Sequence, residues 1–177
     1  FIGDAMMFYL GDPESRGVKE DAAACVRMAI AMQRRLAELQ ARWREQGLID
    51  RPFQARMGIN TGYCTVGNFG SEERMDFTII GGEVNLAARL EEKADEGGIL
   101  LSAETYSLVK GWLIAEEREP LVVKGFANPI RTYSVTGIYE TLPERRRLIQ
   151  AESEGYALMI DLDRLRAESS DDVIRLL

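Results

Sequence analysis

The sequence contains no histidine among its 177 residues. This absence excludes Ser-His-Asp and Cys-His catalysis, because both need an imidazole as the general base. It also excludes every metal site that uses histidine ligands. The chemistry that remains open uses carboxylates, lysine and arginine side chains, hydroxyl groups and backbone amides.

Cysteine is scarce as well: the chain has two, Cys25 and Cys64, without Cys-x-x-Cys spacing. This pattern predicts buried, reduced thiols in a reducing compartment, so we expect a cytoplasmic domain. No apolar run approaches the roughly 20 residues that span a bilayer, and no signal-peptide pattern opens the sequence. If a longer parent protein is anchored in a membrane, this domain is expected on the cytoplasmic side.

Positive charge is in deficit, because Lys and Arg total 22 against 29 Asp and Glu, for a formal net charge of −7. A nucleic-acid-binding domain needs a basic face, so this balance disfavours nucleic acid as a partner. Local basic residues can still bind a phosphorylated small molecule. With 46% apolar and 29% charged residues, the composition is that of an ordinary globular protein.

Hydrophobic periodicity predicts helices over 20–46 and 83–94, and a third from an N-cap at Ser102 to about 109. The apolar stripe of the first helix is interpreted as core packing. Strands are predicted over 5–10, 53–60, 63–66, 75–80, 99–101, 112–117, 120–124 and 131–138, the second and third joined as a hairpin. The predicted fold class is α/β or α+β, with one mixed or antiparallel sheet and helices packed on it.

The character of the sequence changes after Gly137, where it becomes polar and charged. We therefore expect a main domain over 1–140 and a C-terminal appendage over 141–177, with a strand at 156–162 and a helix at 171–177. The chain opens at Phe1, without Met, directly before an apolar run. We interpret this opening as a cut inside a domain.

Asn85 and Arg89 are four residues apart on the second predicted helix, so they share one helix face. An amide beside a guanidinium, next to the end of a strand, suits an anionic phosphate with a sugar near it. A solvated helix face with a routine arginine is the alternative that the spacing alone leaves open.

Five motifs occur in a fixed order along residues 1–138. They are Phe1-Ile-Gly-Asp4, Arg56-Met-Gly-Ile-Asn-Thr-Gly62, Val66-Gly-Asn-Phe-Gly-Ser71, Asp76-Phe-Thr-Ile-Ile-Gly-Gly-Glu-Val-Asn-Leu-Ala-Ala-Arg89 and Val123-Lys-Gly125. In this order the set resembles the class III nucleotidyl cyclase catalytic domain, the adenylate and guanylate cyclases. The resemblance implies a ferredoxin-like, palm-type βαββαβ core and a head-to-tail homodimer with two sites built from both chains.

The resemblance also implies a reaction and its residues. The ribose 3′-hydroxyl of ATP would attack the α-phosphate, releasing pyrophosphate and giving cyclic AMP, with two divalent ions, Mg²⁺ or Mn²⁺. Asp4 matches a metal-binding aspartate, Thr78 the position that reads the adenine edge, and Asn85 the asparagine that orients the ribose. Arg89 matches the arginine that stabilises charge at the α-phosphate, and Lys124 the lysine that holds the terminal phosphates. Threonine at position 78 looks like the bacterial subgroup, class IIIb, that includes bicarbonate-responsive enzymes.

Three features of the family fall before Phe1: the first metal-binding aspartate, the phosphate-cradling turn and the lysine that helps select adenine. Taken literally, the chain is therefore expected to be inactive by itself. Asp161 and Asp163 are interpreted as ordinary strand residues rather than substitutes for the aspartate. A regulatory module joined upstream is expected, and its identity is left open.

Two alternatives to an adenylate cyclase remain. A guanylate cyclase is the nearest, and Thr78 speaks against it. The other is a degenerate cyclase-homology domain that serves as a dimerisation or nucleotide-sensing module.

Overall fold

The computed structural model describes residues 5–71, 74–139, 148–153 and 156–161. The chain divides into two compact units, Phe1–Thr136 and Gly137–Leu177. The predictions that fall on Asp4, on Asp163 and on a helix at 171–177 lie outside the described residues.

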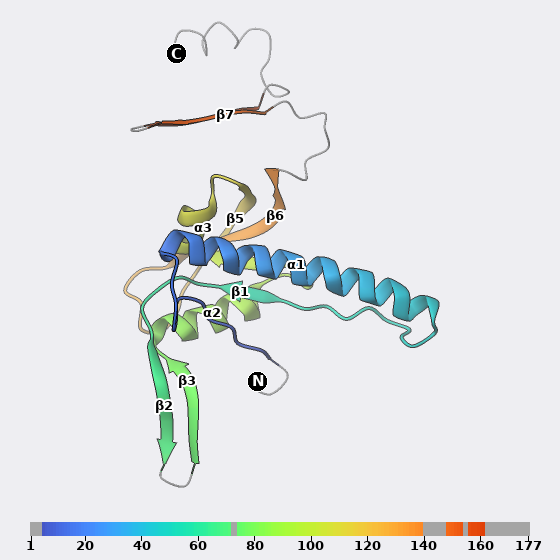
Figure 1. The fold of residues 1–177 in the computed structure, drawn as a ribbon, viewed down its shortest axis with the longest axis horizontal. Helices are drawn as coiled ribbons and strands as arrows, with labels where there is room; N and C mark the ends of the chain where they lie inside the picture. The colour runs from blue at the N-terminus through green and yellow to red at the C-terminus, as the bar shows by residue number, and fades with distance from the viewer. Residues whose placement is uncertain (1–4, 72–73, 140–147, 154–155, 162–177) are drawn as a thin grey trace, which may run out of the picture. The chain divides into compact units, whose positions relative to one another are not determined.

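The first helix, α1, runs over Val18–Glu45 and confirms the helix predicted at 20–46 (Figure 1). Glu20 and Asp21 lie in its first turn and Arg42 and Arg44 in its last, so the charges at both ends complement the helix dipole. The core-packing interpretation holds for its first half, where Ala22, Ala23, Val26 and Ala29 are buried.

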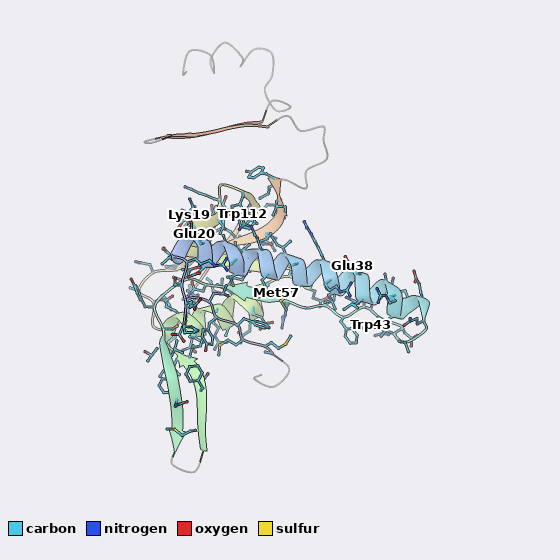
Figure 2. The ribbon with its side chains drawn as sticks, in the orientation of Figure 1. Lys19, Glu20, Glu38, Trp43, Met57 and Trp112 are labelled. Carbon is cyan, nitrogen blue, oxygen red and sulfur yellow. The ribbon has the colours of Figure 1, made fainter. Side chains whose placement is uncertain are left out.

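In the second half of α1 only Gln40 is buried, and the returning chain contacts this half at a few side chains. Gln33 and Gln40 donate to the carbonyls of Ala55 and Phe53, at 2.6 and 3.1 Å. Trp43, labelled in Figure 2, packs edge to face on the Phe53 ring, with centroids 6.3 Å apart. Glutamine side chains therefore fix the extended segment that leads into the sheet.

The sheet of the first unit has the strand order β1-β4-β6-β5 among the described residues. Its strands are β1 (Met57–Ile59), β4 (Ile99–Ser102), β5 (Leu113–Leu121) and β6 (Ile130–Ile138). β1 pairs in parallel with β4, and β4 pairs antiparallel with β6. All four residues of β4 are buried, as expected of a central strand.

Two further helices contact the β1 and β4 side of this sheet. Helix α2 (Gly82–Lys93) and helix α3 (Ala103–Val109) confirm the second and third predicted helices, and the Ser102 side chain caps α3 by accepting from the Thr105 amide. Figure 1 shows β1 between α1 and α2. A core cluster joins α2 to the sheet and to the loop after β5, through Leu86, Leu90, Ala94, Leu100 and Val123. The mixed α+β fold class is confirmed.

The hairpin predicted between 53–60 and 63–66 is wrong. Residues 57–59 pair with β4 instead, and β2 (Thr65–Ser71) pairs antiparallel with β3 (Arg74–Ile80). The intervening polar residues resemble a turn, but they bond to other elements: Asn60 to Glu83, and Thr61 to Thr105 at 3.0 Å. Tertiary contacts therefore decided this pairing.

Two other strand predictions also fail. Residues 6–10 form no strand, and Met6, Phe8 and Leu10 are 54%, 52% and 40% exposed. An apolar run forms a buried strand only where a sheet edge accepts it, and no described strand pairs with residues 6–10. The separate strands predicted at 112–117 and 120–124 are one strand, β5, after which the chain forms a loop.

The second unit contains a hairpin of β7 (Leu148–Ser153) and β8 (Tyr156–Asp161), in antiparallel register. β8 confirms the strand predicted at 156–162. β7 was not predicted, because its sequence lies next to the charged run that was interpreted as part of a polar appendage.

Candidate active site

The β2–β3 hairpin holds Thr78, and Figure 1 shows it extending away from the sheet. Thr78 pairs with Gly67 across the two strands. A Cβ at Gly67 would lie 3.8 Å from the Phe69 ring, so this ring leans over the glycine. Because side chains alternate along a strand, Phe69, Thr78 and Ile80 share one face of the hairpin. That face combines a hydroxyl with a flat aromatic surface that lies over Gly67.

The other hairpin face presents exposed apolar side chains beside Asn68. Met75 and Phe77 are 61% and 62% exposed, and Tyr63, just before β2, is 99% exposed. Ile79, at the base of this face, is buried. The hairpin is thus anchored at its base and presents apolar side chains farther out.

Helix α2 follows β3 after Gly81 and holds Asn85 and Arg89 on its exposed side. The Arg89 guanidinium donates to the Glu92 carboxylate at 2.6 Å, with both side chains more than half exposed. An exposed ion pair of this kind contributes only about 0–1 kcal/mol to stability, so an incoming anion can displace Glu92. Both predicted residues are accessible to a ligand.

Lys124 lies in the loop after β5, exposed, between buried Val123 and Gly125. Gly125 has a φ of +98°, and the Phe126 amide donates to the Val123 carbonyl at 3.1 Å. Val123 belongs to the core cluster with Leu86 and Leu90 of α2. The tight turn therefore anchors Lys124 beside α2, although 35 positions separate it from Arg89 in the sequence.

The structure thus connects four predicted site residues through two neighbouring elements and a loop. Thr78 lies on the hairpin that leads into α2, Asn85 and Arg89 lie on α2, and Lys124 lies on the loop packed against α2. No hydrogen bond joins any two of these side chains among the described residues. Asp4 lies outside those residues.

No group of three or more Asp, Glu or Cys side chains among the described residues could hold a metal ion. These residues therefore do not form a metal site by themselves.

Two features of the electrostatics were not expected. Cys64 is exposed rather than buried, while partial burial raises the pKa of the Cys25 thiol; both are free.

Arg131 makes two hydrogen bonds to Glu117, at 2.7 and 3.0 Å, and these bonds hold the pKa of that carboxyl below its ordinary value. Both side chains of this pair are exposed on the sheet surface, and Arg131 also lines a cavity that Asn60 and Glu83 border.

Sequence reasoning assigned no role to Asn60 and Glu83, although both stand inside quoted motifs. The Asn60 amide donates to the Glu83 carboxylate at 2.7 Å, at the start of α2 and beside a cavity of about 780 Å³. The sequence shows both only as polar residues near glycines, and it does not show that the two side chains meet.

Among the described residues, no helix is both long and apolar enough to cross a bilayer.

Comparison with known proteins gives a consistent picture. A family profile described as the adenylate and guanylate cyclase catalytic domain matches residues 1–137. The chain is 30% identical over 140 residues to Adenylate cyclase 1 of Rhizobium meliloti, covering 78% of this chain and 20% of that protein. It thus spans about a fifth of the length of that curated relative.

Solved structures indicate the same family. The adenylyl cyclase CyaB from P. aeruginosa is 54% identical, with a TM-score of 0.66 over 71% of this chain and 63% of that one. The guanylyl cyclase Cya2 is 30% identical, with a TM-score of 0.64 over 76% and 66% of the two chains. The chain therefore belongs to the family of adenylate and guanylate cyclase catalytic domains.

Proposed function

We propose that the chain is the catalytic domain of an adenylate cyclase, which converts ATP to 3′,5′-cyclic AMP and pyrophosphate. The ribose 3′-oxygen loses its proton and bonds to the α-phosphorus, while the bond from that phosphorus to the β-phosphate bridging oxygen breaks. The observation that supports this most is the succession of Thr78, exposed Asn85 and exposed Arg89 on a hairpin and the helix that follows it. The adenylate assignment is favoured by the relatives named adenylate or adenylyl cyclases.

Each residue has a role that its chemistry suits. The Thr78 hydroxyl would accept from the adenine 6-amino group, because a hydroxyl both donates and accepts. Asn85 would orient the ribose, and Arg89 would stabilise the charge that develops at the α-phosphate. Lys124, as a point charge at a loop tip, would hold the terminal phosphates.

Two divalent ions, Mg²⁺ or Mn²⁺, belong to this proposal, with Asp4 as one ligand. Bound ions of this kind activate the attacking hydroxyl and neutralise charge on the leaving group. The remaining ligands would come from outside the described residues. The protein residues named above bind and orient the nucleotide, which is most of what phosphoryl transfer asks of a protein.

A homodimer is part of the same proposal. The exposed apolar face of the β2–β3 hairpin, with Met75 and Phe77, suits burial against a second copy. The catalytic domain would comprise residues 1–140, with 141–177 as an appendage and a regulatory module joined upstream.

A guanylate cyclase is the second candidate, because the chain is 30% identical to a guanylyl cyclase of similar fold. Incubating the full-length protein with ATP or GTP and Mg²⁺ or Mn²⁺ separates the two. We expect cyclic AMP and pyrophosphate in equal amounts from ATP, and a much lower rate with GTP. Preferential formation of cyclic GMP would establish the second candidate instead.

The same assay tests the site. Arg89→Ala is expected to lower kcat about 10²-fold or more, because it removes a donor to the transition state. Arg118→Ala removes a comparably exposed arginine, paired with Asp95, and is expected to stay within about twofold of the unmodified protein. No cyclic nucleotide from the unmodified protein, or a rate unaffected by Arg89→Ala, would contradict the proposal.

A further inference from the structure

Glu83, in the first turn of α2, is held in place by the end of β1. The Asn60 side-chain amide donates to the Glu83 carboxylate at 2.7 Å and to the Glu83 backbone carbonyl at 3.1 Å. We call this pair of hydrogen bonds the Asn60–Glu83 latch. Both bonds are partly buried, so water competes for them less than at an open surface.

Gly62 makes room for the latch. A Cβ at position 62 would lie 2.5 Å from Cγ and 2.7 Å from Oε2 of Glu83. The Glu83 side chain therefore lies directly across the glycine backbone. Any larger residue at position 62 would push the carboxylate away from Asn60.

The middle of α2 has its own attachment to the same strand. A Cβ at Gly58 would lie 2.2 Å from the Glu91 amide nitrogen and 2.3 Å from the Ala87 carbonyl oxygen, so β1 and α2 touch backbone to backbone. Arg56, just before β1, pairs with Glu91 at 3.2 Å. The backbone contact at Gly58 fixes the helix at one point along its length and leaves its first turn to be fixed by something else. The Arg56–Glu91 pair adds little, because both of its side chains are more than a third exposed.

The N-terminus of α2 lacks the usual means of fixation. Its N-cap is Gly81, with a φ of +152°, and no side chain caps the helix. Only Gly81 separates α2 from β3, and the helix itself begins with Gly82; glycine permits many backbone conformations. The hairpin therefore does not hold the first turn rigidly, and the latch supplies the missing constraint.

We infer that Glu83 is a positioning residue, which fixes the first turn of α2 so that Asn85 and Arg89 keep the orientation that the nucleotide requires; this inference rests on the proposed function. Successive residues of a helix are rotated by about 100°, so Glu83 and Asn85 point in nearly opposite directions. Glu83 therefore faces β1, and Asn85 faces the side where the nucleotide would bind. Loss of the latch shifts Asn85 and Arg89 together, and a displacement of about 1 Å at such groups costs up to about 10²-fold in rate.

A carboxylate in a first turn also interacts with the helix dipole. The variants therefore have to distinguish the effect of the Glu83 charge from the effect of its hydrogen bond to Asn60. Glu83→Gln removes the charge but keeps an oxygen that can accept from Asn60. Glu83→Ala removes both. Glu91→Ala is the matched control, since it removes a carboxylate that also reaches toward β1 from the same helix.

The kinetic experiment uses the full-length protein with Mg-ATP. We expect Glu83→Ala to lower kcat by 10-fold or more with a smaller change in KM, while Glu83→Gln and Glu91→Ala stay within about threefold. In an Arg89→Ala background, the loss caused by Glu83→Ala is expected to shrink, because residues that act through one another are not additive. Equal losses in both backgrounds, or a Gln variant as impaired as the Ala variant, would overturn the inference.

A second measurement does not depend on activity. Hydrogen exchange of the amides at 84–88 is expected to rise in Glu83→Ala, but not in Glu83→Gln, with α3 unchanged as the internal reference. Unchanged exchange in Glu83→Ala would overturn the latch even in an active enzyme. Failure of the proposed function would show differently, as the absence of any cyclic nucleotide from the unmodified protein.

Discussion

Thr78 lies directly opposite Gly67 in the β2–β3 hairpin, so the strand that holds the predicted base-reading hydroxyl faces a position without a side chain. The Phe69 ring leans over that glycine on the same face. A flat, uncrowded surface of this kind suits a planar ligand such as a purine base.

Filling the position at Gly67 tests this relationship. Gly67 does not have a positive φ, so Gly67→Val fits the strand backbone and places its methyl groups beside Thr78. We expect KM for ATP to rise about 10-fold or more with a smaller effect on folding, as measured by steady-state kinetics and thermal unfolding. Gly111→Val adds the same side chain at another glycine without a positive φ, where nothing lies within 4 Å of the added Cβ, and should leave KM within about threefold. An equal rise in both variants would show that the hairpin face has no part in binding.

The hydroxyl of Thr78 is expected to influence base selection. Thr78→Ala removes one hydrogen bond, worth about 0.5–1.5 kcal/mol, so the preference for ATP over GTP in kcat/KM should fall roughly 3- to 10-fold. Thr78→Ser keeps the hydroxyl and should retain the preference. If the serine variant loses it as well, the methyl group rather than the hydroxyl is what matters.

The apolar hairpin face is expected to mediate self-association. Replacing Met75 and Phe77 by serine removes two side chains that are more than 60% exposed in the single chain. Sedimentation velocity of the full-length protein should show dimers weakened by 10-fold or more in Kd, since apolar burial stabilises association by about 25 cal/mol per Å². Leu48→Ser changes a 66% exposed leucine in the loop after α1 and should leave association unchanged.

Complementation tests whether the two protomers share each site. Asp4→Ala and Arg89→Ala should each lose nearly all activity, and a 1:1 mixture should regain about a quarter of full activity. This value follows because about half of randomly formed dimers are mixed, and each of these contains one intact site. A mixture that stays inactive, although sedimentation shows exchange of subunits, would place all of the catalytic groups in one chain.

The Glu117–Arg131 pair predicts a small dependence of stability on pH. Because Arg131 lowers the pKa of Glu117 in the folded state, the pair contributes stability above the ordinary pKa of 4.5. That contribution is lost as the pH falls through the lowered value. The difference in free energy of unfolding between the unmodified protein and Glu117→Gln should therefore be present at pH 7 and vanish in acid. High salt should reduce it, because both groups are exposed.

The helices, and the placement of Asn85 and Arg89 on one helix face, could be predicted from the sequence, because both follow from local spacing. The three-to-four-residue repeat along α1, the hydroxyl of Ser102 at an N-cap and the four-residue separation of Asn85 and Arg89 each depend on one short segment. The strand at 131–138 and the fold class followed in the same way. These features need no knowledge of what packs against them.

Strand pairing could not be predicted in this way, because it depends on partners far apart in the chain. Residues 57–59 satisfy their backbone bonds with β4, about 40 positions later, rather than with the segment that follows. Met6, Phe8 and Leu10 are exposed for the same reason, since an apolar run alone does not determine which sheet edge receives it. The tertiary structure alone decided that Asn60 meets Glu83, that Gly67 lies opposite Thr78 and that Lys124 lies beside α2. Each of these contacts joins segments whose separate sequences contain no information about their distance.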